Sequence, residues 1–361
     1  MKTLIIASIY DYSGKTMVSL GVGKRLQADG YKVGYMTPLG RYPIMVDDVL
    51  VDSDAAFMSG VLQLDDPLEI VSPTMITQEI ISRAYRGEHL GLEERIIHAH
   101  DEFSKSKDVL IMGWSGTINQ GNLIGVSIKE LVDRLDARVI VLYKCQGEVF
   151  VDELLPLVDF FRDKMAGVVI NQLEFNAIER VKNGVAPFLA SRGLNVLGIF
   201  LSDPIVMSVT VEELAAALDG EILCCKHKMD ELIEQFSVGA MSSENAIIHF
   251  REIKGKAVIT CGDRSNIQIA ALEAEAKCII LTGNIYPDEA VIAKANKQKV
   301  PVILVGADSI STIRQIEDIM GTLRIRDERK ANRAIELVNK ELDFPLLYEC
   351  LDLKAYSKAA S

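Results

Sequence analysis

Six short, nearly continuous apolar runs in the first two hundred residues constrain the fold of this chain more than any other feature. They are TLIIASI (3–9), KVGYM (32–36), DVLIMGW (108–114), ARVIVLY (137–143), MAGVVI (165–170) and NVLGIF (195–200). Their content of Val, Ile and Leu is typical of parallel strands that are buried on both faces. Because amphipathic segments such as KTMVSLGVGKRLQADG lie between them, the pattern predicts a doubly wound α/β domain built on a parallel sheet.

A second, shorter series of apolar runs follows and predicts a smaller α/β domain. Its runs are KAVITCG (256–262), AKCIILTG (276–283) and VPVILVG (300–306). We therefore expect three parts: a first domain over residues 1–220, a second over residues 221–320, and a C-terminal helical tail over residues 321–361. The tail is charged, and we expect it to dock on the body of the protein or on a second subunit.

Composition excludes several classes of partner. The chain of 361 residues has a formal net charge of −12, which argues against a nucleic-acid groove or an anionic membrane surface as the main partner. No stretch approaches the roughly 18 apolar residues of a membrane span, and the start MKTLIIASIYDY is interpreted as a first strand and not as a signal peptide. The six cysteines include no C-x-x-C pair. We expect a cytoplasmic protein with free thiols.

The segment ASIYDYSGKTMVSLG (7–21) predicts an anion site at the first strand–helix turn. Backbone N–H groups at a helix start, the Lys15 charge and the Thr16 hydroxyl are suited to a phosphate and Mg²⁺. The usual spacing of such a loop places its first glycine at Ile9, or at Ser8 if the loop is one residue longer. Neither is glycine, so the loop is incomplete.

The order of motifs resembles the dethiobiotin synthetase-like P-loop family over roughly residues 1–215. The matching segments are ASIYDYSGKT, KVGYMTPLG, VDSDAAFM, DVLIMGWSG, GVVINQL and LGIFLSDP followed by TVEEL. The resemblance implies ATP or ADP with Mg²⁺ as cofactors. It implies the following roles: phosphate and cofactor contacts for Ser13, Gly14, Lys15 and Thr16, an adenine contact for Asn171, and Mg²⁺ contacts for Thr16 and Asp54, with Asp52 close by.

Residues 221–320, with GDRSNIQIAALEAEAKCIILTGN, resemble the DRTGG domain, a regulatory module. The tandem resembles the N-terminal, regulatory half of long-form phosphate acetyltransferases. This implies a phosphate acetyltransferase or a related metabolic enzyme as partner, and no acetyltransferase activity of the chain by itself.

Polar turns follow each strand of the second series, where parallel sheets usually bind ligands. The candidate residues for a regulatory ligand are Asp263, Arg264, Ser265, Thr282, Asn284 and Asp308. Asp263 and Ser265 are also expected to cap the helix that follows them. The alternative is that all of these residues only cap helices and close turns.

Two positions depart from the P-loop family pattern. The lysine that contacts the reacting group is Thr37 here, and an acidic Mg²⁺ partner is Met112. Since cations must neutralise charge in such a transition state, we expect weak or absent ATPase or ligase activity and assign no catalytic residue. Trp114 is expected in the core.

Three functional hypotheses follow. The first is a nucleotide-binding regulatory or scaffolding protein that forms a homo-oligomer. The second is an active ATP-dependent ligase of the dethiobiotin or cobyrinate synthetase type with relocated catalytic residues. The third is a purely structural oligomer.

Overall fold

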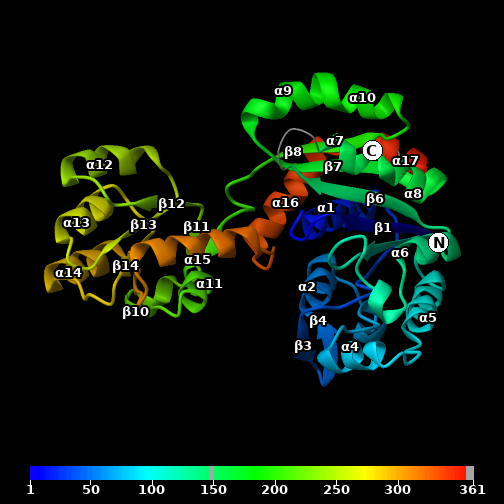
Figure 1. Cartoon of the computed structure of the whole chain (residues 1–361), viewed down its shortest axis with the longest axis horizontal. Coiled ribbons are helices and arrows are strands. Elements are labelled where there is room, and N and C mark those ends of the chain that lie inside the picture. Colours follow the sequence, from blue (N-terminus) through cyan, green and yellow to red (C-terminus); the bar gives the residue numbers. More distant parts are fainter. Residues whose placement is uncertain (146–149, 355–361) are drawn as a thin grey trace. The chain divides into compact units, whose positions relative to one another are not determined.

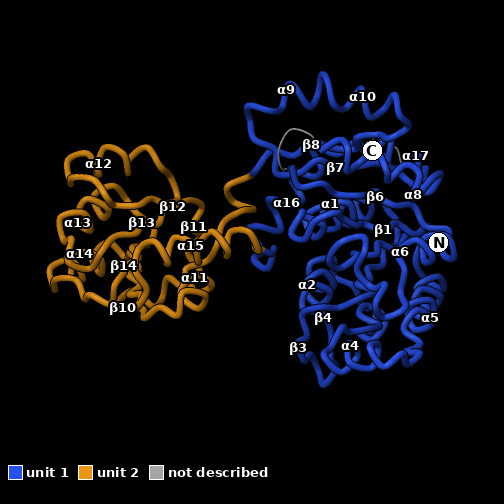
Figure 2. The backbone as a smooth tube through the Cα atoms, in the orientation of Figure 1, with its two compact units in different colours: residues 1–202, 324–361 blue, residues 203–323 orange. Residues whose placement is uncertain are grey.

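The computed structural model describes residues 1–145 and 150–354, which form two compact units (Figure 2). The first unit contains Met1–Ser202 together with the chain from Arg324 onward, and the second contains Asp203–Leu323. Among the described residues there is no helix with the length and apolarity needed to span a membrane.

The first unit is built on a six-stranded sheet in which every neighbouring pair is parallel (Figure 1). In spatial order its strands are β2 (Val33–Met36), β5 (Val109–Gly113), β1 (Lys2–Ser8), β6 (Arg138–Lys144), β7 (Met165–Leu173) and β8 (Val196–Leu201). Each strand comes from one of the six apolar runs. The predicted doubly wound α/β class is therefore confirmed for this unit.

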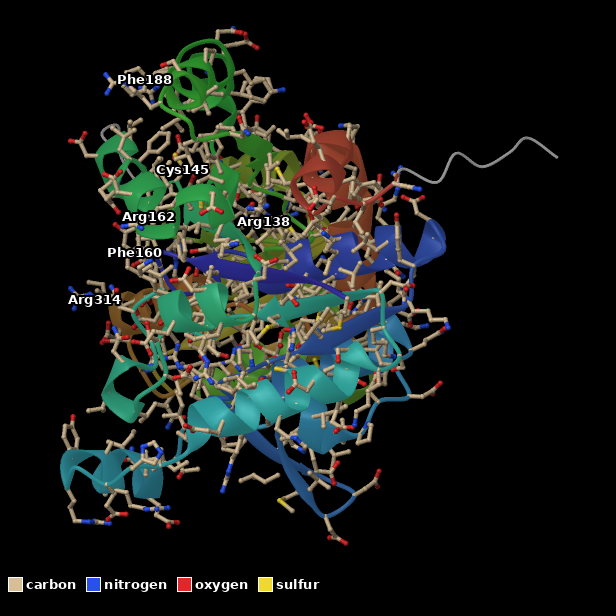
Figure 3. The ribbon with its side chains drawn as sticks, turned by 90° about the vertical axis from the view of Figure 1, so that its right-hand side faces the viewer. Arg138, Cys145, Phe160, Arg162, Phe188 and Arg314 are labelled. Carbon is tan, nitrogen blue, oxygen red and sulfur yellow. The ribbon has the colours of Figure 1, made fainter. Side chains whose placement is uncertain are left out.

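Helices connect these strands, as the amphipathic segments predict. They are α1 (Lys15–Ala28), α2 (Ser53–Leu62), α3 (Leu68–Val71), α4 (Gln78–Tyr85), α5 (Leu92–Ser104), α6 (Ile128–Arg134), α7 (Val151–Leu154), α8 (Pro156–Phe161), α9 (Ile178–Arg180) and α10 (Ala186–Ser191). An antiparallel hairpin of β3 (Pro43–Val46) and β4 (Val49–Asp52) precedes α2. Cys145 follows β6 as a half-buried free thiol (Figure 3), and burial raises its pKa.

The C-terminal helices belong to the first unit. They are α16 (Glu328–Glu341) and α17 (Phe344–Cys350). Helix α16 packs so closely on α1 that a Cβ added at Gly21 would lie 2.2 Å from the Cβ of Val338. The Arg25 guanidinium lies over the ring of Phe344, 5.0 Å from its centroid. Of the two positions expected for the tail, the structure supports docking on the body; residues 355–361 of the predicted tail lie outside the described residues.

The second unit has a five-stranded sheet. Its spatial order is β10 (Glu221–Cys224), β15 (Val302–Leu304), β14 (Cys278–Thr282), β13 (Lys256–Cys261) and β12 (Gln235–Val238), with only β10 antiparallel to its neighbour. Its helices are α11 (Val211–Ala217), α12 (Ser243–Glu252), α13 (Ser265–Glu273), α14 (Glu289–Gln298) and α15 (Ser309–Gly321). A two-stranded ladder joins β9 (Val209–Thr210) to β11 (Leu232–Ile233).

The boundaries of the units differ from the predicted ones at 220/221 and 320/321. The chain enters the second unit at Asp203 and leaves it after Leu323. The capping box of Thr210 and Glu213 starts α11, and Leu214 of that helix is buried in the same apolar cluster as Ile303. Because α11 has the amphipathic pattern of the earlier helices, the sequence does not reveal which sheet it covers.

Candidate functional site

The loop between β1 and α1 makes its final turn at Gly14, where only glycine fits. The residue has a φ of 92°, in the left-handed region that glycine adopts without cost. A Cβ at this position would also lie 2.2 Å from Nδ2 of Asn171. That nitrogen donates a hydrogen bond of 2.9 Å to the carbonyl of Ser13. The end of β7 therefore supports the loop directly; the adenine contact expected of Asn171 stays a prediction.

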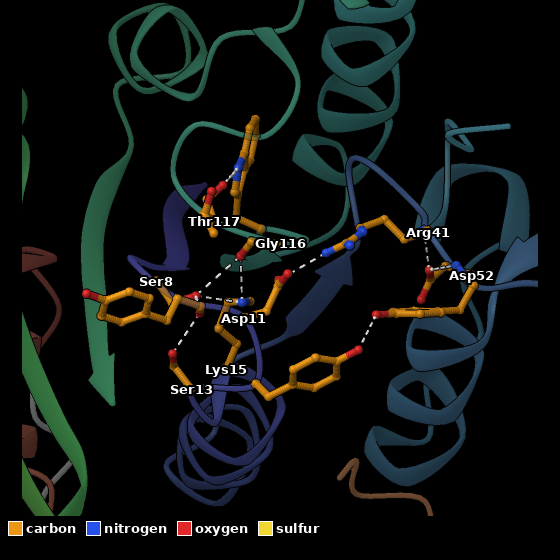
Figure 4. Close-up of polar contacts among 12 residues, drawn as sticks. Ser8, Asp11, Ser13, Lys15, Arg41, Asp52, Gly116 and Thr117 are labelled. Carbon is orange, nitrogen blue, oxygen red and sulfur yellow. Dashed lines mark hydrogen bonds and ion pairs between the residues drawn. The ribbon is translucent and has the colours of Figure 1, made fainter. Parts of the chain in front are cut away.

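Lys15, the first residue of α1, folds back across the loop toward the sheet (Figure 4). Its Nζ donates to Oγ of Ser8 at 2.6 Å and to the carbonyl of Gly116 at 2.7 Å. Burial lowers the pKa of Lys15 to about 8, and the nearby Asp11 carboxylate partly opposes that shift. The cation is thus held at the carboxyl edge of the sheet, beside the N-terminus of α1.

Ser8 stands where a longer form of the loop would have its first glycine. Its hydroxyl donates to the carbonyl of Tyr10 at 2.7 Å and accepts from Lys15. Ser13 donates to the same carbonyl of Tyr10 at 2.7 Å. The departure from glycine therefore supplies a hydroxyl that orders both the loop and its lysine. Thr16 follows Lys15 in the first turn of α1 and is half-buried.

A second group of charges lies beside the loop. Arg41 donates to the Asp11 carboxylate at 3.0 Å (Figure 4). Asp52 accepts from the backbone N–H groups of Arg41 at 2.7 Å and Tyr42 at 3.0 Å, and it caps α2 through the N–H of Asp54 at 2.9 Å. The carboxylate of Asp52 is therefore used to hold the backbone between β2 and α2.

Asp54, the predicted Mg²⁺ contact, faces arginines that the sequence analysis did not single out. Its Oδ1 lies 3.9 Å from Nη1 of Arg324, and Arg326 donates to Oγ of the adjacent Ser53 at 2.9 Å. Burial, followed by the charge of Asp52, raises the pKa of Asp54. Both arginines come from GTLRIRDERK, which the sequence presents only as the start of a charged tail.

The two positions that depart from the family pattern are both buried. Thr37 is 3% exposed and its hydroxyl donates to that of Tyr35 at 3.3 Å, while Met112 is fully buried in β5. Trp114 is also fully buried, and its indole N–H donates to the carbonyl of Thr117 at 3.1 Å. Trp114 is thus part of the core, and neither Thr37 nor Met112 offers a charge to a ligand.

These donors do not fit a resident Mg²⁺ ion. Mg²⁺ prefers an octahedron of oxygen ligands that commonly includes one or two carboxylates. Thr16 offers a hydroxyl, Met112 offers no oxygen, and Asp54 faces Arg324. Within residues 1–145 and 150–354, no group of three or more His, Cys, Asp or Glu side chains is arranged to hold a metal. Without a nucleotide the described residues form no Mg²⁺ cage of their own, and the Mg²⁺ contacts expected of Thr16 and Asp54 stay a prediction.

In the second unit, the candidate residues lie at or just after the ends of β13, β14 and β15 but mostly bond within the protein. Arg264 donates to the carbonyl of Met241 at 2.8 Å and to that of Gly239. Thr282 and Ser309 share a hydroxyl–hydroxyl bond of 2.7 Å. Asp308 caps α15 through the N–H groups of Ile310 and Ser311.

The predicted capping of α13 is wrong. Arg264 is the residue that precedes this helix, and no side chain caps it. Ser265 instead donates to the Asp288 carboxylate, since the turn after β14 approaches closely enough that a Cβ at Gly262 would meet the carbonyl of Ile285. Asn284 adopts a φ of 54° in that turn. A ligand for these residues, including Asp263, stays a prediction.

Two family models match consecutive parts of the sequence. Residues 2–210 match the AAA domain, and residues 213–319 match the DRTGG domain. The chain belongs to the AAA domain family. Its second part is a DRTGG domain, as the sequence resemblance predicts. The change from one match to the next falls between residues 210 and 213, before the predicted boundary at 220.

Curated relatives carry the name phosphate acetyltransferase. The protein from Deinococcus radiodurans is 24% identical over 95% of this chain and 50% of its own length. That from Pseudomonas aeruginosa is 23% identical over 96% of this chain and 52% of its own length. The chain therefore spans about half the length of the curated relatives that it matches.

Solved structures show weaker likeness. One match is to the CBS and DRTGG domains of the regulatory region of Clostridium perfringens pyrophosphatase, solved in complex with the activator diadenosine tetraphosphate. It covers 48% of this chain and 71% of that one, with 19% identity and a TM-score of 0.29. The MinD cell division protein of Aquifex aeolicus matches 57% of this chain and 84% of that one, with 13% identity and a TM-score of 0.33.

Proposed function

We propose that this chain binds ATP or ADP at the β1–α1 loop and acts as a nucleotide-binding regulatory or scaffolding protein. The position of Lys15 carries the proposal: its ammonium group lies beside the N-terminus of a 14-residue helix, at the carboxyl edge of a parallel sheet. Helix N-termini and a lysine together favour phosphate groups. The left-handed turn at Gly14 brings the backbone into this arrangement.

The phosphate group would have to replace the present partners of Lys15. Nζ now bonds to Ser8 and Gly116, so a phosphate oxygen must compete with a hydroxyl and a carbonyl. A charged acceptor forms the stronger bond, which favours the exchange. Ser13 and Asn171 would then hold the loop in place as the lysine turns outward.

Titration calorimetry with ADP and ATP tests the proposal. We expect binding by the wild type and a loss of at least about tenfold in affinity for Lys15→Ala, since a charge-assisted hydrogen bond is removed. Lys105→Ala is the matched control, because the exposed Lys105 lies just before the amino end of β5, at the opposite edge of the sheet, and pairs with Glu102. Equal binding by wild type and Lys15→Ala would contradict the proposal.

We propose that nucleotide turnover is weak or absent. Thr37 and Met112 are uncharged and buried, so these two positions supply none of the charges that phosphoryl chemistry requires. The ligase alternative predicts release of ADP when candidate amine or carboxylate substrates are added. ADP release by the wild type well above that by Lys15→Ala would favour the ligase hypothesis over the regulatory one.

We further propose a phosphate acetyltransferase or a related metabolic enzyme as the partner, and a homo-oligomer as the working form. The relatives support the first point, because they carry the name phosphate acetyltransferase. Light scattering of the full chain, alone and mixed with an acetyltransferase catalytic polypeptide, measures both. A monomeric chain would contradict the homo-oligomer. A chain that does not co-elute with the catalytic polypeptide, and leaves its acetyl transfer unchanged with and without ADP, would contradict the partner.

A further inference from the structure

The chain that returns from the second unit places two arginines beside the candidate phosphate site. The second unit ends at Leu323, and Arg324 and Arg326 follow at once. Asp327 then caps α16 through the N–H groups of Arg329 and Lys330, so the segment is anchored immediately after the arginines. The position of these two side chains therefore depends on the fold of the first unit.

Arg324 is connected to the phosphate loop through two tyrosines. Its guanidinium group lies over the ring of Tyr42, and the hydroxyl of Tyr42 lies 3.1 Å from that of Tyr12 in the loop. The side chain of Arg324 is 18% exposed. It is thus held at the edge of the site and still reaches solvent, as a ligand contact requires.

The balance of charge at the site favours an anion. Lys15 and Arg41 lie at the loop, and Arg324 and Arg326 lie beside it at Asp54 and Ser53. Three carboxylates accompany them: Asp11, Asp52 and Asp54. Asp52 is already used by backbone N–H groups. A local excess of positive charge at this site, in a chain whose net charge is −12, indicates a binding site for a negatively charged group.

We propose that Arg324 and Arg326 contact the terminal phosphates of the nucleotide and supply the positive charge that Thr37, Met112 and Mg²⁺ do not. This inference rests on the proposed binding of nucleotide at Lys15. Guanidinium groups bind phosphate oxygens in a bidentate manner, without a metal ion. Asp54 then has a different role from a metal ligand: it holds Arg324 while the site is empty of phosphate, and it releases the guanidinium to the ligand.

The first test compares ADP and ATP binding by the full chain in excess EDTA and in Mg²⁺. We expect the wild type to bind with affinities within about threefold of each other in the two conditions, and Arg324→Met and Arg326→Ala each to bind about tenfold more weakly. Arg324→Met keeps an unbranched side chain against Tyr42. Arg324→Lys, which keeps the charge and loses the fork, should bind with intermediate affinity. Arg314→Gln on α15 of the second unit is the control for the loss of one exposed charge.

The second test is Asp54→Asn, for which the two roles predict opposite results. If Asp54 competes with phosphate for Arg324, the variant binds nucleotide as tightly as the wild type or a few-fold more tightly, because a negative charge has been removed. If Asp54 holds Mg²⁺, the variant loses affinity in Mg²⁺ and not in EDTA.

The outcomes separate the two proposals. Loss of binding in Lys15→Ala with wild-type affinity in the folded arginine variants would overturn the role of the arginines and leave the proposed function standing. The role of the arginines would also be overturned, and the proposed function left standing, if the wild type bound nucleotide in Mg²⁺ but not in EDTA, or if Asp54→Asn weakened binding only in Mg²⁺. No binding by the wild type in either condition would overturn both. Circular dichroism establishes that each variant is folded.

Discussion

Gly14 combines two constraints at the turn into α1. Its φ of 92° is strained for other residues, and a Cβ would collide with Nδ2 of Asn171. We expect Gly14→Ala to lower the free energy of unfolding of the first unit by about 1–3 kcal/mol. Urea unfolding followed by the fluorescence of Trp114, the only tryptophan and fully buried in this unit, measures the change.

A matched glycine separates these constraints from a general effect of glycine replacement. Gly60 in α2 has no neighbour within 4 Å of an added Cβ, so Gly60→Ala should leave stability unchanged or raise it by up to about 1 kcal/mol. If Gly14→Ala is as stable as Gly60→Ala, the described turn is not the one in solution.

At the residue scale, the sequence identified the loop but not its surroundings. Lys15 and Gly14 were predictable because local spacing along a strand–turn–helix segment determines where they stand. The partners of Lys15 were not, because Gly116 is 101 residues away in sequence. Arg324 was not predicted for the same reason: the sequence around a charged residue in a charged tail does not indicate which residue it contacts.

At the scale of elements, the contact between α1 and α16 depends on a glycine. Since a Cβ at Gly21 would overlap Val338, we expect Gly21→Ala to destabilise the first unit by about 1–3 kcal/mol. Val338→Ala should reduce that cost in part, because it removes the two methyl groups at 2.4 and 2.8 Å but keeps the Cβ at 2.2 Å. Urea unfolding of the two single variants and the double variant gives the coupling energy, and additive effects would contradict the contact.

The contact between α5 and β1 predicts a dependence of stability on pH. His100 is bonded to Thr3 at 2.9 Å, and burial lowers its pKa below the ordinary 6.5. Between the lowered pKa of His100 in the folded chain and its pKa of 6.5 in the unfolded chain, only the unfolded chain binds the proton. The stability that neutral His100 contributes is therefore complete above pH 6.5 and is lost as the pH falls from 6.5 toward the folded pKa. Urea unfolding at pH 7.5 and 5.5 should show the loss.

His100→Gln keeps a polar side chain beside Thr3 without the titration, and should reduce the difference between the two pH values. His98→Gln, an exposed change on the same helix, should leave that difference as it is in the wild type. An unchanged difference in His100→Gln would show that other groups cause the loss.

At the scale of the whole molecule, the chain leaves the first unit and returns to it. The return segment carries Arg324 and Arg326, so a nucleotide that they contact should order the backbone from residue 320 to 327. We expect ADP to slow amide hydrogen exchange there, as well as in the β1–α1 loop. Lys15→Ala should abolish both effects, and protection of the loop alone would contradict a contact by the arginines.

The apolar runs by themselves determined that this protein contains two α/β sheets, because continuous Val, Ile and Leu segments of strand length can only be buried on both faces. They also determined where the phosphate loop lies, since it follows directly from the first run. Tertiary structure alone decided that α11 covers the second sheet, that α16 closes the first, and that Arg324 stands beside Asp54. The physical reason is range: strand burial and turn geometry are encoded within a few neighbouring residues, whereas the partner of a helix face or a side-chain charge is chosen by packing between segments hundreds of residues apart.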